Sequence, residues 1–285
     1  LASTCFPFDS WQANPPPPGH NWPADCDAYD RNFEFVLDPA ASASERPGIE
    51  LVRAITPFGG PMRFEVDVTD LANGLPGKHR LQAYIATWPD PAGRVSGARG
   101  GWNVSARLEV KHGEPPRRVL AVVPLFDGVQ TTAGSPGPVS FTVPEGVARS
   151  RLEYRATGHG GGSADADCIG HADEFCKRVH TLRVDGEVFE TVTPWRNDCK
   201  DLCTLETHTW PSGGTMQYCR ENPCGAIASV RAPRANWCPG SVTPPLARGV
   251  PALTIAGAHT FAWDVAKIAD GGSWRISAHW IAYGP

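Results

Sequence analysis

Short segments of alternating apolar and polar residues, separated by glycine and proline, constrain the fold of this chain more than any other feature. The 285 residues include 30 glycines and 28 prolines, which punctuate the sequence and do not form one low-complexity tract. An alternation with a period of two places apolar side chains on one face of a β-strand, and Gly or Pro between such segments marks a turn. The pattern predicts an all-β protein of antiparallel strands.

The predicted strands form two series. The first series comprises residues 33–37, 63–69, 81–88 and 102–110, interrupted by a helical turn at residues 70–73. The second series comprises residues 119–125, 139–143, 152–157, 179–184, 188–192, 260–265 and 274–283, with a hairpin turn at Asp185-Gly186. The polar, proline-containing residues 114–118 separate the series and predict a linker, so we expect one domain at 1–113 and a second at 119–285.

Charge and hydropathy exclude several classes of protein. The 26 basic and 30 acidic residues give a net charge of -4 without a basic stripe, which argues against a nucleic-acid partner. No segment approaches the roughly 20 apolar residues of a membrane span, so no membrane association is expected. We expect a monomer.

Nine cysteines predict disulfide bonds formed in an oxidising compartment. A zinc site is the rival interpretation, but no pair has CxxC spacing, so we expect neither a metal nor a cofactor. The chain also begins at Leu1 without Met or a signal-like apolar run. Together these features predict a processed protein that is secreted or periplasmic.

Two stretches concentrate functional chemistry. Residues 26–31, Cys-Asp-Ala-Tyr-Asp-Arg, place two carboxylates, an aromatic ring and a guanidinium immediately before the first predicted strand. Alone, such a stretch is more typical of a disulfide-anchored surface turn. The interval 194–251 is loop-rich, holds five of the nine cysteines and contains Arg234-Ala235-Asn236-Trp237-Cys238-Pro239-Gly240. Loops of this length within a compact domain are usually functional.

Seven sequence blocks, taken in order and spacing, resemble the bacterial peptide-N-glycosidase F family. The blocks are residues 26–31, 55–57, 65–70, 84–88, 121–124, 174–176 and 234–240. The resemblance extends from Cys26 to the C-terminus and implies two side-by-side antiparallel, eight-stranded, jelly-roll-like β-sandwiches with the active site in the cleft between them. It also implies hydrolysis of the amide between asparagine and the innermost N-acetylglucosamine of N-glycosylated peptides and proteins.

The resemblance also implies roles for individual residues. The catalytic acids fall on Asp30, as the proton-transfer carboxylate, and on Glu174, as the group that holds and polarises a water. The implied substrate contacts are Arg31, Tyr29, Trp88, Arg94, His159, Phe175, Arg234 and Trp237. Ordinary core packing is an equally good interpretation of Trp88 and Trp237. His159 lies in the glycine-rich segment 158–162, expected to be a flexible loop, and is as easily a loop residue without contact to substrate.

For the cysteines we expect bonds between Cys5 and Cys26, between Cys168 and Cys176, and between Cys199 and Cys238. This leaves Cys203, Cys219 and Cys224. Because nine is an odd number, we expect one of these three to be unpaired or bonded outside the chain, and which one stays open.

One position departs from the family pattern. Where the family typically has a glutamate before Thr87-Trp88, this chain has Ala86. Crowded carboxylates raise one another's pKa, so the missing acid predicts a lower pKa for Asp30 than in relatives with the full set, and an acid-active enzyme.

Three other functions compete with an amidase. Ala86 favours a non-catalytic lectin that keeps the cleft, whereas the retained acids and arginines argue against it. A copper monooxygenase shares the paired-sandwich architecture by analogy but needs clustered histidines and a methionine. The nine histidines contain no HxH pair and only Met62 and Met216 are present. Nothing specific supports a protease inhibitor or adhesin module.

Overall fold

The protein is described by a computed structural model that covers residues 29–42, 44–87, 102–209 and 213–285. In chain order its elements are β1 (Asn32–Leu37), β2 (Ile49–Ile55), α2 (Thr69–Gly74), β3 (Leu81–Ile85), β4 (Val119–Gln130), β5 (Val139–Val143), β6 (Arg149–Gly160), η1 (Asp173–Phe175), β7 (His180–Val184), β8 (Glu187–Val192), η2 (Cys199–Leu202), β9 (Leu205–Thr209), β10 (Thr215–Cys219), α3 (Ile227–Arg231), β11 (Ser241–Val242), β12 (Leu246–Arg248), η3 (Pro251–Thr254), β13 (Gly257–Val265) and β14 (Gly272–Tyr283). The all-β prediction is confirmed. None of the described helices is long and apolar enough to cross a membrane.

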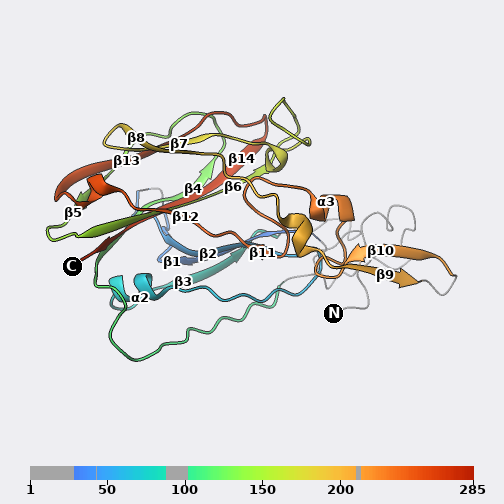
Figure 1. The fold of residues 1–285 in the computed structure, drawn as a ribbon, viewed down its shortest axis with the longest axis horizontal. Helices are drawn as coiled ribbons and strands as arrows, with labels where there is room; N and C mark the ends of the chain where they lie inside the picture. Colours follow the sequence, from blue (N-terminus) through green and yellow to red (C-terminus); the bar gives the residue numbers. More distant parts are fainter. Residues whose placement is uncertain (1–28, 43, 88–101, 210–212) are drawn as a thin grey trace.

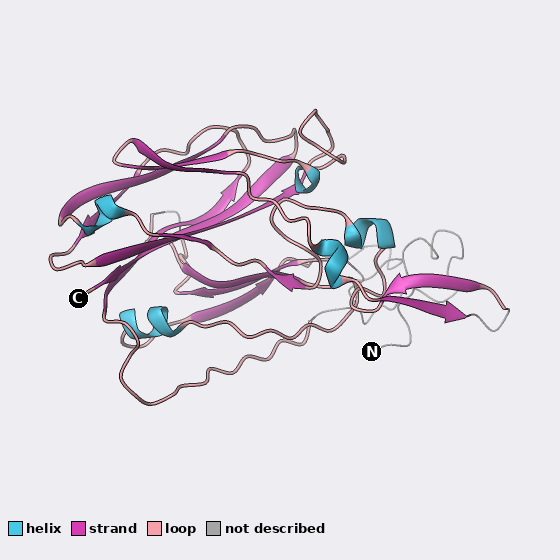
Figure 2. Cartoon of the chain, in the orientation of Figure 1, coloured by secondary structure: helices cyan, strands magenta, loops and turns pink. Residues whose placement is uncertain are grey.

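The described strands form three four-stranded antiparallel sheets stacked as layers (Figure 1), and a separate hairpin, β9–β10, projects from one end (Figure 2). The strand orders are β11-β2-β1-β3, β12-β6-β14-β4 and β5-β13-β7-β8. The last two sheets enclose one apolar core and make a sandwich. We call the first sheet the outer sheet and the second the middle sheet. The expected count of eight strands in each sandwich stays a prediction.

Tryptophan and other large side chains fill the sandwich. Trp263, Trp274 and Trp280 are fully buried there, with Tyr154 and Phe261 beside them. Strand β14 runs through the centre of the middle sheet, between β4 and β6, and nearly all of its residues are buried on both faces. This happens because the outer sheet covers the face of the middle sheet that is turned away from the sandwich core.

The contact between outer and middle sheets is charged at its centre. Arg53 of β2 binds Glu50 through two hydrogen bonds of 2.7 Å, and both side chains are fully buried. Arg155 of β6 reaches the same Glu50 carboxylate at 3.2 Å. Arg275 of β14 binds Glu34 of β1 through two hydrogen bonds of 2.7 Å. The ion pairs Arg155–Glu50 and Arg275–Glu34 therefore join the outer sheet to the middle sheet. The Arg53–Glu50 pair lies within β2 and holds the Glu50 carboxylate in position.

A bulge explains why β2 lacks the alternation of apolar and polar residues that predicts a strand. The pairing register between β1 and β2 shifts at Phe35/Val36, where Val52 and Glu50 are consecutive partners and Leu51 is the extra residue. An extra residue reverses the alternation of side chains along a strand. Glu50 and Arg53 can then point to the same buried side although they are three positions apart.

Two predicted strands are wrong. Residues 63–68 and 102–110 have no strand structure, and Val104, Leu108 and Val110 are exposed. Alternation of apolar residues indicates which face of a strand would be buried, but a strand also needs a neighbouring strand to bind its backbone groups. Neither segment pairs with a described strand. The predicted helical turn, by contrast, is α2, and the predicted hairpin turn at Asp185-Gly186 connects β7 to β8, with both residues at positive φ.

Strand β11, from the long interval 194–251, pairs with β2 in the outer sheet. The second half of the chain thus contributes a strand to the sheet of the first half. The division at residues 114–118 stays a prediction.

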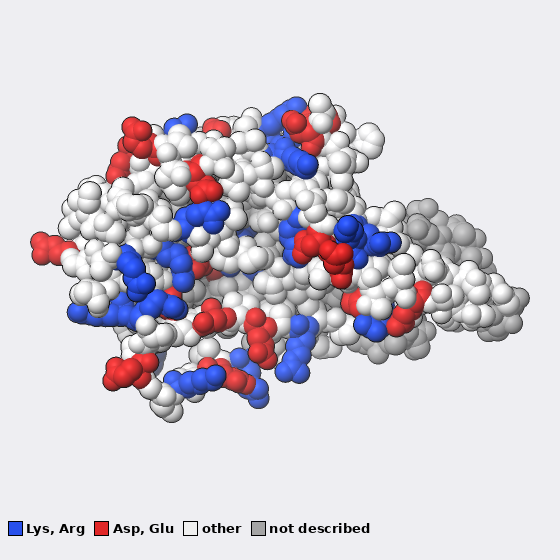
Figure 3. Space-filling model, viewed as in Figure 1, with Lys and Arg blue, Asp and Glu red and all other residues white. Residues whose placement is uncertain are grey.

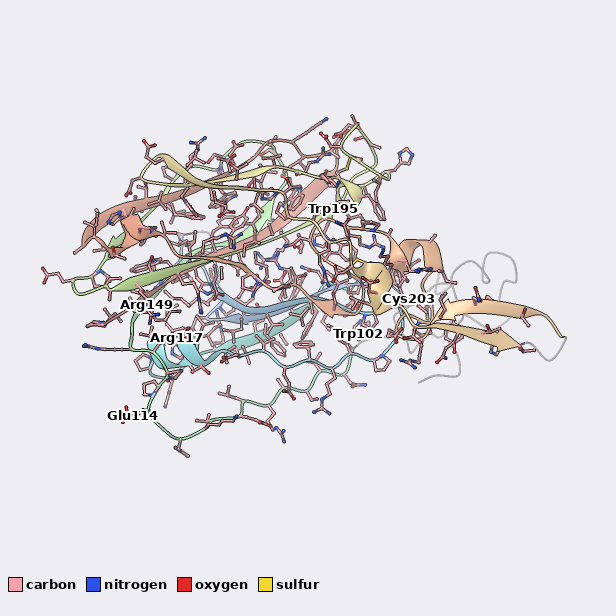
Figure 4. All side chains as sticks on the ribbon, viewed as in Figure 1. Trp102, Glu114, Arg117, Arg149, Trp195 and Cys203 are labelled. Atoms are coloured by element: carbon pink, nitrogen blue, oxygen red, sulfur yellow. A yellow bond between two sulfur atoms is a disulfide. The ribbon has the colours of Figure 1, made fainter. Side chains whose placement is uncertain are left out.

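The disulfides predicted at Cys168–Cys176 and Cys199–Cys238 are present. A third bond joins Cys203 to Cys219 at the base of the hairpin β9–β10 (Figure 4). Cys224 is also disulfide-bonded, so the expectation that one of Cys203, Cys219 and Cys224 is unpaired is wrong. The expected partners Cys5 and Cys26 lie outside the described residues.

Glu50→Gln should destabilise the protein by about 3–5 kcal/mol, because it leaves Arg53 as a buried cation without its partner. The measurement is the free energy of unfolding from urea titration. Glu65→Gln, which removes an acid from a fully exposed pair with Arg63, is the control and should leave the midpoint unchanged. Equal midpoints for Glu50→Gln and wild type would show that the buried pair does not hold the sheets together.

Candidate active site

The first part of the site is the entry to β1. The backbone N–H of Arg31 donates to Thr56 Oγ1 at 2.8 Å, and the N–H of Thr56 donates back to the Arg31 carbonyl at 2.8 Å. These bonds extend the β1–β2 ladder past Asn32 and Ile55. Asp30 is therefore fixed at the end of the outer sheet. The Arg31 guanidinium lies over the Tyr29 ring, 5.0 Å from its centroid.

The second part is the short turn η1, which carries Glu174. Its anchor is Asp173, a fully buried carboxylate that accepts from Arg178 Nε at 2.9 Å and from Trp274 Nε1 at 3.1 Å. The Cys168–Cys176 bond closes the same loop. With the residue before it locked into the core and the disulfide after it, Glu174 has little freedom to change position.

Arg234 joins the two parts. Its Nη1 binds Glu174 Oε1 at 3.0 Å, and its Nη2 donates to the carbonyl and hydroxyl of Ser229 at 2.8 and 2.9 Å. The guanidinium lies between two rings, 4.6 Å from the centroid of Phe175 and 4.4 Å from that of Trp237. Stacking and hydrogen bonds thus hold this cation in one orientation at a site where it is almost completely buried.

The charges of these residues act on one another. Burial raises the pKa of Asp30 to about 6, Arg234 lowers it, Glu174 raises it, and Arg31 lowers it. Burial also raises the pKa of Glu174, against the opposing charge of Arg234. Arg31 does favour the Asp30 anion, as expected, but burial outweighs it. Asp30 and Glu174 therefore raise the cost of ionising each other, while Arg234 favours the anion of both.

Trp237 packs against Arg234, and His159 packs against Trp237. The His159 ring stacks on Trp237 with centroids 5.5 Å apart, and Trp237 Nε1 donates to the Gly158 carbonyl at 2.8 Å. Burial lowers the pKa of His159 to about 3, so its imidazole is neutral at working pH. Contrary to expectation, His159 does not lie on a flexible loop: it lies in β6, because residues 158–160 pair with β14.

The structure therefore brings together most of the residues selected from the sequence. Asp30, Glu174 and Arg234 form the centre, and the others surround it: Arg31, Tyr29, His159, Phe175 and Trp237. Trp237 is buried, with His159 and Arg234 against its ring. Trp88 and Arg94 lie outside the described residues.

Two supporting residues were missed. Asp173 helps to fix Glu174 and Ser229 helps to fix Arg234, yet Asp173 stands in a polar loop and Ser229 in a short apolar stretch between a cysteine and an arginine. No sequence signal would have separated them from ordinary surface residues.

Comparison with known proteins identifies the family of this chain. Residues 130–282 match the family model described as peptide-N-glycosidase F, C terminal. No curated protein sequence matches the chain.

Solved structures share the fold. A crystal structure of peptide-N(4)-(N-acetyl-β-D-glucosaminyl) asparagine amidase matches with a TM-score of 0.63 and 19% identity, covering 92% of this chain and 81% of that one. PNGase F, a glycosylasparaginase from Flavobacterium meningosepticum, matches with a TM-score of 0.60 and 18% identity, covering 91% and 80%.

The third comparison is PNGF-II, with a TM-score of 0.58 and 20% identity over 90% of this chain. This chain spans 55% of the length of PNGF-II. The family model covers more than half of the chain, and the β-sandwich architecture agrees with it. The chain belongs to the peptide-N-glycosidase F family.

Proposed function

We propose that this protein is a peptide-N4-(N-acetyl-β-glucosaminyl)asparagine amidase, which hydrolyses the amide between asparagine and the innermost N-acetylglucosamine of N-linked glycans. The observation that carries the proposal is Glu174 bonded to the buried guanidinium of Arg234, with the buried Asp30 close enough for the charges of both to act on it, in a member of this family. The disulfides and the family support a secreted or periplasmic location.

An amide resists hydrolysis because its carbonyl is a poor electrophile and its nitrogen a poor leaving group. The site must therefore activate water, stabilise the developing oxyanion and protonate the nitrogen. In the proposed reaction Glu174 holds and polarises a water, whose oxygen forms a bond to the side-chain carbonyl carbon. The carbon–nitrogen bond then breaks, and the nitrogen leaves with a proton as the glycosylamine. Aspartate remains on the peptide.

Asp30 is the proposed proton carrier of this reaction. A group that transfers protons works best when its pKa is close to the working pH. Burial moves the pKa of Asp30 from 3.8 to about 6, which suits that task. Arg31 is the proposed donor to the sugar or to the oxyanion, and Arg234 keeps Glu174 in position through their ion pair.

A non-catalytic N-glycan lectin is the second candidate, because Ala86 replaces an acid typical of the family. A single experiment separates the two. A defined glycopeptide is incubated in heavy-oxygen water, and the products are analysed by mass spectrometry. An amidase converts asparagine to aspartate, incorporates one heavy oxygen and releases the intact glycan. A lectin binds the same glycopeptide and leaves it unchanged.

Asp30→Asn should abolish turnover and preserve the fold. The change is nearly isosteric and removes only the titrating group. Because the pKa of Asp30 is raised from 3.8 to about 6 in the folded protein, its contribution to stability is lost as pH rises between these two values and stays lost at higher pH. The variant should therefore melt no lower than wild type at pH 8. Asp38→Asn, at the far end of β1, is the control and should keep full activity. Wild-type turnover by the Asp30 variant would remove this residue from the mechanism.

Glu174→Gln should lower kcat at least about 100-fold, the scale of a positioned acid or base. Glutamine keeps a hydrogen bond to Arg234 but lacks the negative charge that polarises the water. Single-turnover kinetics on one glycopeptide measures the effect. A decrease smaller than about threefold, far below that scale, would make Glu174 a structural residue.

Ala86→Glu should shift the acidic limb of the pH–rate profile, which we assign to ionisation of Asp30, to higher pH. The measurement is the pH–rate profile of wild type and variant on one glycopeptide. The backbone N–H of Ala86 donates to the Asn32 carbonyl at 3.2 Å, so position 86 is across the sheet from the Asp30 segment. A new carboxylate there disfavours the Asp30 anion and raises its pKa. If the anion is the active form, activity is lost at higher pH than in wild type during acidification. An acidic limb that stays at the same pH or shifts to lower pH would contradict the link between Ala86 and acid activity.

A further inference from the structure

A second site candidate lies at the opposite end of β6 from His159. Two neighbouring hollows occur there, between α2, β6, β12 and the end of β14. The first, of about 250 Å³, is lined by residues of both charges, including Asp67, Asp70 and Glu153. The second, of about 290 Å³, is lined by four arginines and no carboxylate: Arg117, Arg149, Arg151 and Arg248. We call the second hollow the arginine pocket.

The arginine pocket is far from the candidate active site. Arg149 and His159 lie at opposite ends of the single strand β6, so at about 3.3 Å per residue they are roughly 30 Å apart. Figure 4 shows Arg149 and Arg117 close together at the end of the molecule that also holds the C-terminus, away from α3. Figure 3 shows a blue patch of basic side chains on this end. The pocket is thus not an extension of the Asp30 site.

Neighbouring acids neutralise three of the four arginines. Arg117 and Arg151 share the buried carboxylate of Asp70, at 2.8 and 3.1 Å, and Arg151 also reaches Glu153 at 2.9 Å. Arg248 binds Glu190 at 2.8 Å. None of these three acids lines the arginine pocket, whereas all four arginines do.

Arg149 is the exception. Its guanidinium lies over the Tyr283 ring at 5.8 Å, on which Arg151 also lies at 5.7 Å, and it makes no ion pair with any described residue. The Nε of Arg151 is buried and has no hydrogen-bond partner among the described groups. Arg149 therefore adds to the pocket a positive charge that no described carboxylate offsets, and such a charge attracts an anion.

We propose that the arginine pocket binds an oxyanion, namely a carboxylate, sulfate or phosphate group. Guanidinium groups present planar pairs of N–H donors that match two oxygens of such a group, and hydrogen bonds between charged partners are the strong ones. Arg149 supplies the unneutralised charge, while the carboxylates paired with Arg117, Arg151 and Arg248 hold those side chains in place. This proposal does not depend on the amidase assignment.

The test is calorimetric titration of the full chain with inorganic sulfate at constant ionic strength. We expect saturable binding that Arg149→Gln weakens about tenfold or more, the scale of a lost hydrogen bond to a charged group. Arg149→Lys keeps the charge but loses the planar pair of donors, so its affinity should fall between the two. Arg149 is exposed and holds no carboxylate in place, so these variants should fold.

The matched control is Arg63→Gln, which removes the same charge from a fully exposed side chain elsewhere. It should bind sulfate as wild type does. A parallel titration with N-acetylneuraminic acid distinguishes a sugar carboxylate from a free inorganic anion. Saturable binding of either probe that depends on Arg149 supports the site. Absence of saturable binding to both probes, or equal binding by wild type and Arg149→Gln, overturns it.

Discussion

Buried ion pairs between two sheets are the interaction on which this structure depends. The outer sheet and the middle sheet come from distant parts of the chain, and the centre of their contact is Glu50 with Arg53 and Arg155. Burial alone would raise the pKa of Glu50, but the two arginines hold it below its ordinary value. A carboxylate that is charged, buried and bound by cations from both sheets tolerates only one alignment of those sheets.

That alignment is what creates the candidate active site. Asp30 stands at the end of the outer sheet, whereas Glu174 and Arg234 belong to segments packed against β6 of the middle sheet. Arg53 also donates to Thr157 Oγ1 at 3.1 Å, and the same hydroxyl contacts His159 Nε2 at 2.8 Å. A continuous set of hydrogen bonds therefore connects the ion pairs between the sheets to His159, whose ring stacks on Trp237.

Within the site, burial and charge act in opposite directions on the acids. Asp30 and Glu174 are withdrawn from water, which favours their neutral forms, while Arg234 favours their anions. Neither effect eliminates the other, and Asp30 is left with a pKa near 6. This pKa suits the proton-transfer role proposed for Asp30, while the buried His159 imidazole stays neutral.

The sequence by itself determined the all-β class, most strands of the second series, the hairpin turn at Asp185-Gly186, and the disulfides Cys168–Cys176 and Cys199–Cys238. Strand alternation and turn residues are local features of the sequence. The residues that lie around Asp30 were selected from the sequence blocks that resemble the family. Only the tertiary structure decided the rest. β2 was hidden because its inward residues, Glu50 and Arg53, are charged and separated by a bulge. Residues 102–110 alternate without a pairing partner, and Asp173 acquires its role through Arg178 and Trp274. Buried charges and strand partners depend on groups that are distant in sequence, so no local pattern can specify them.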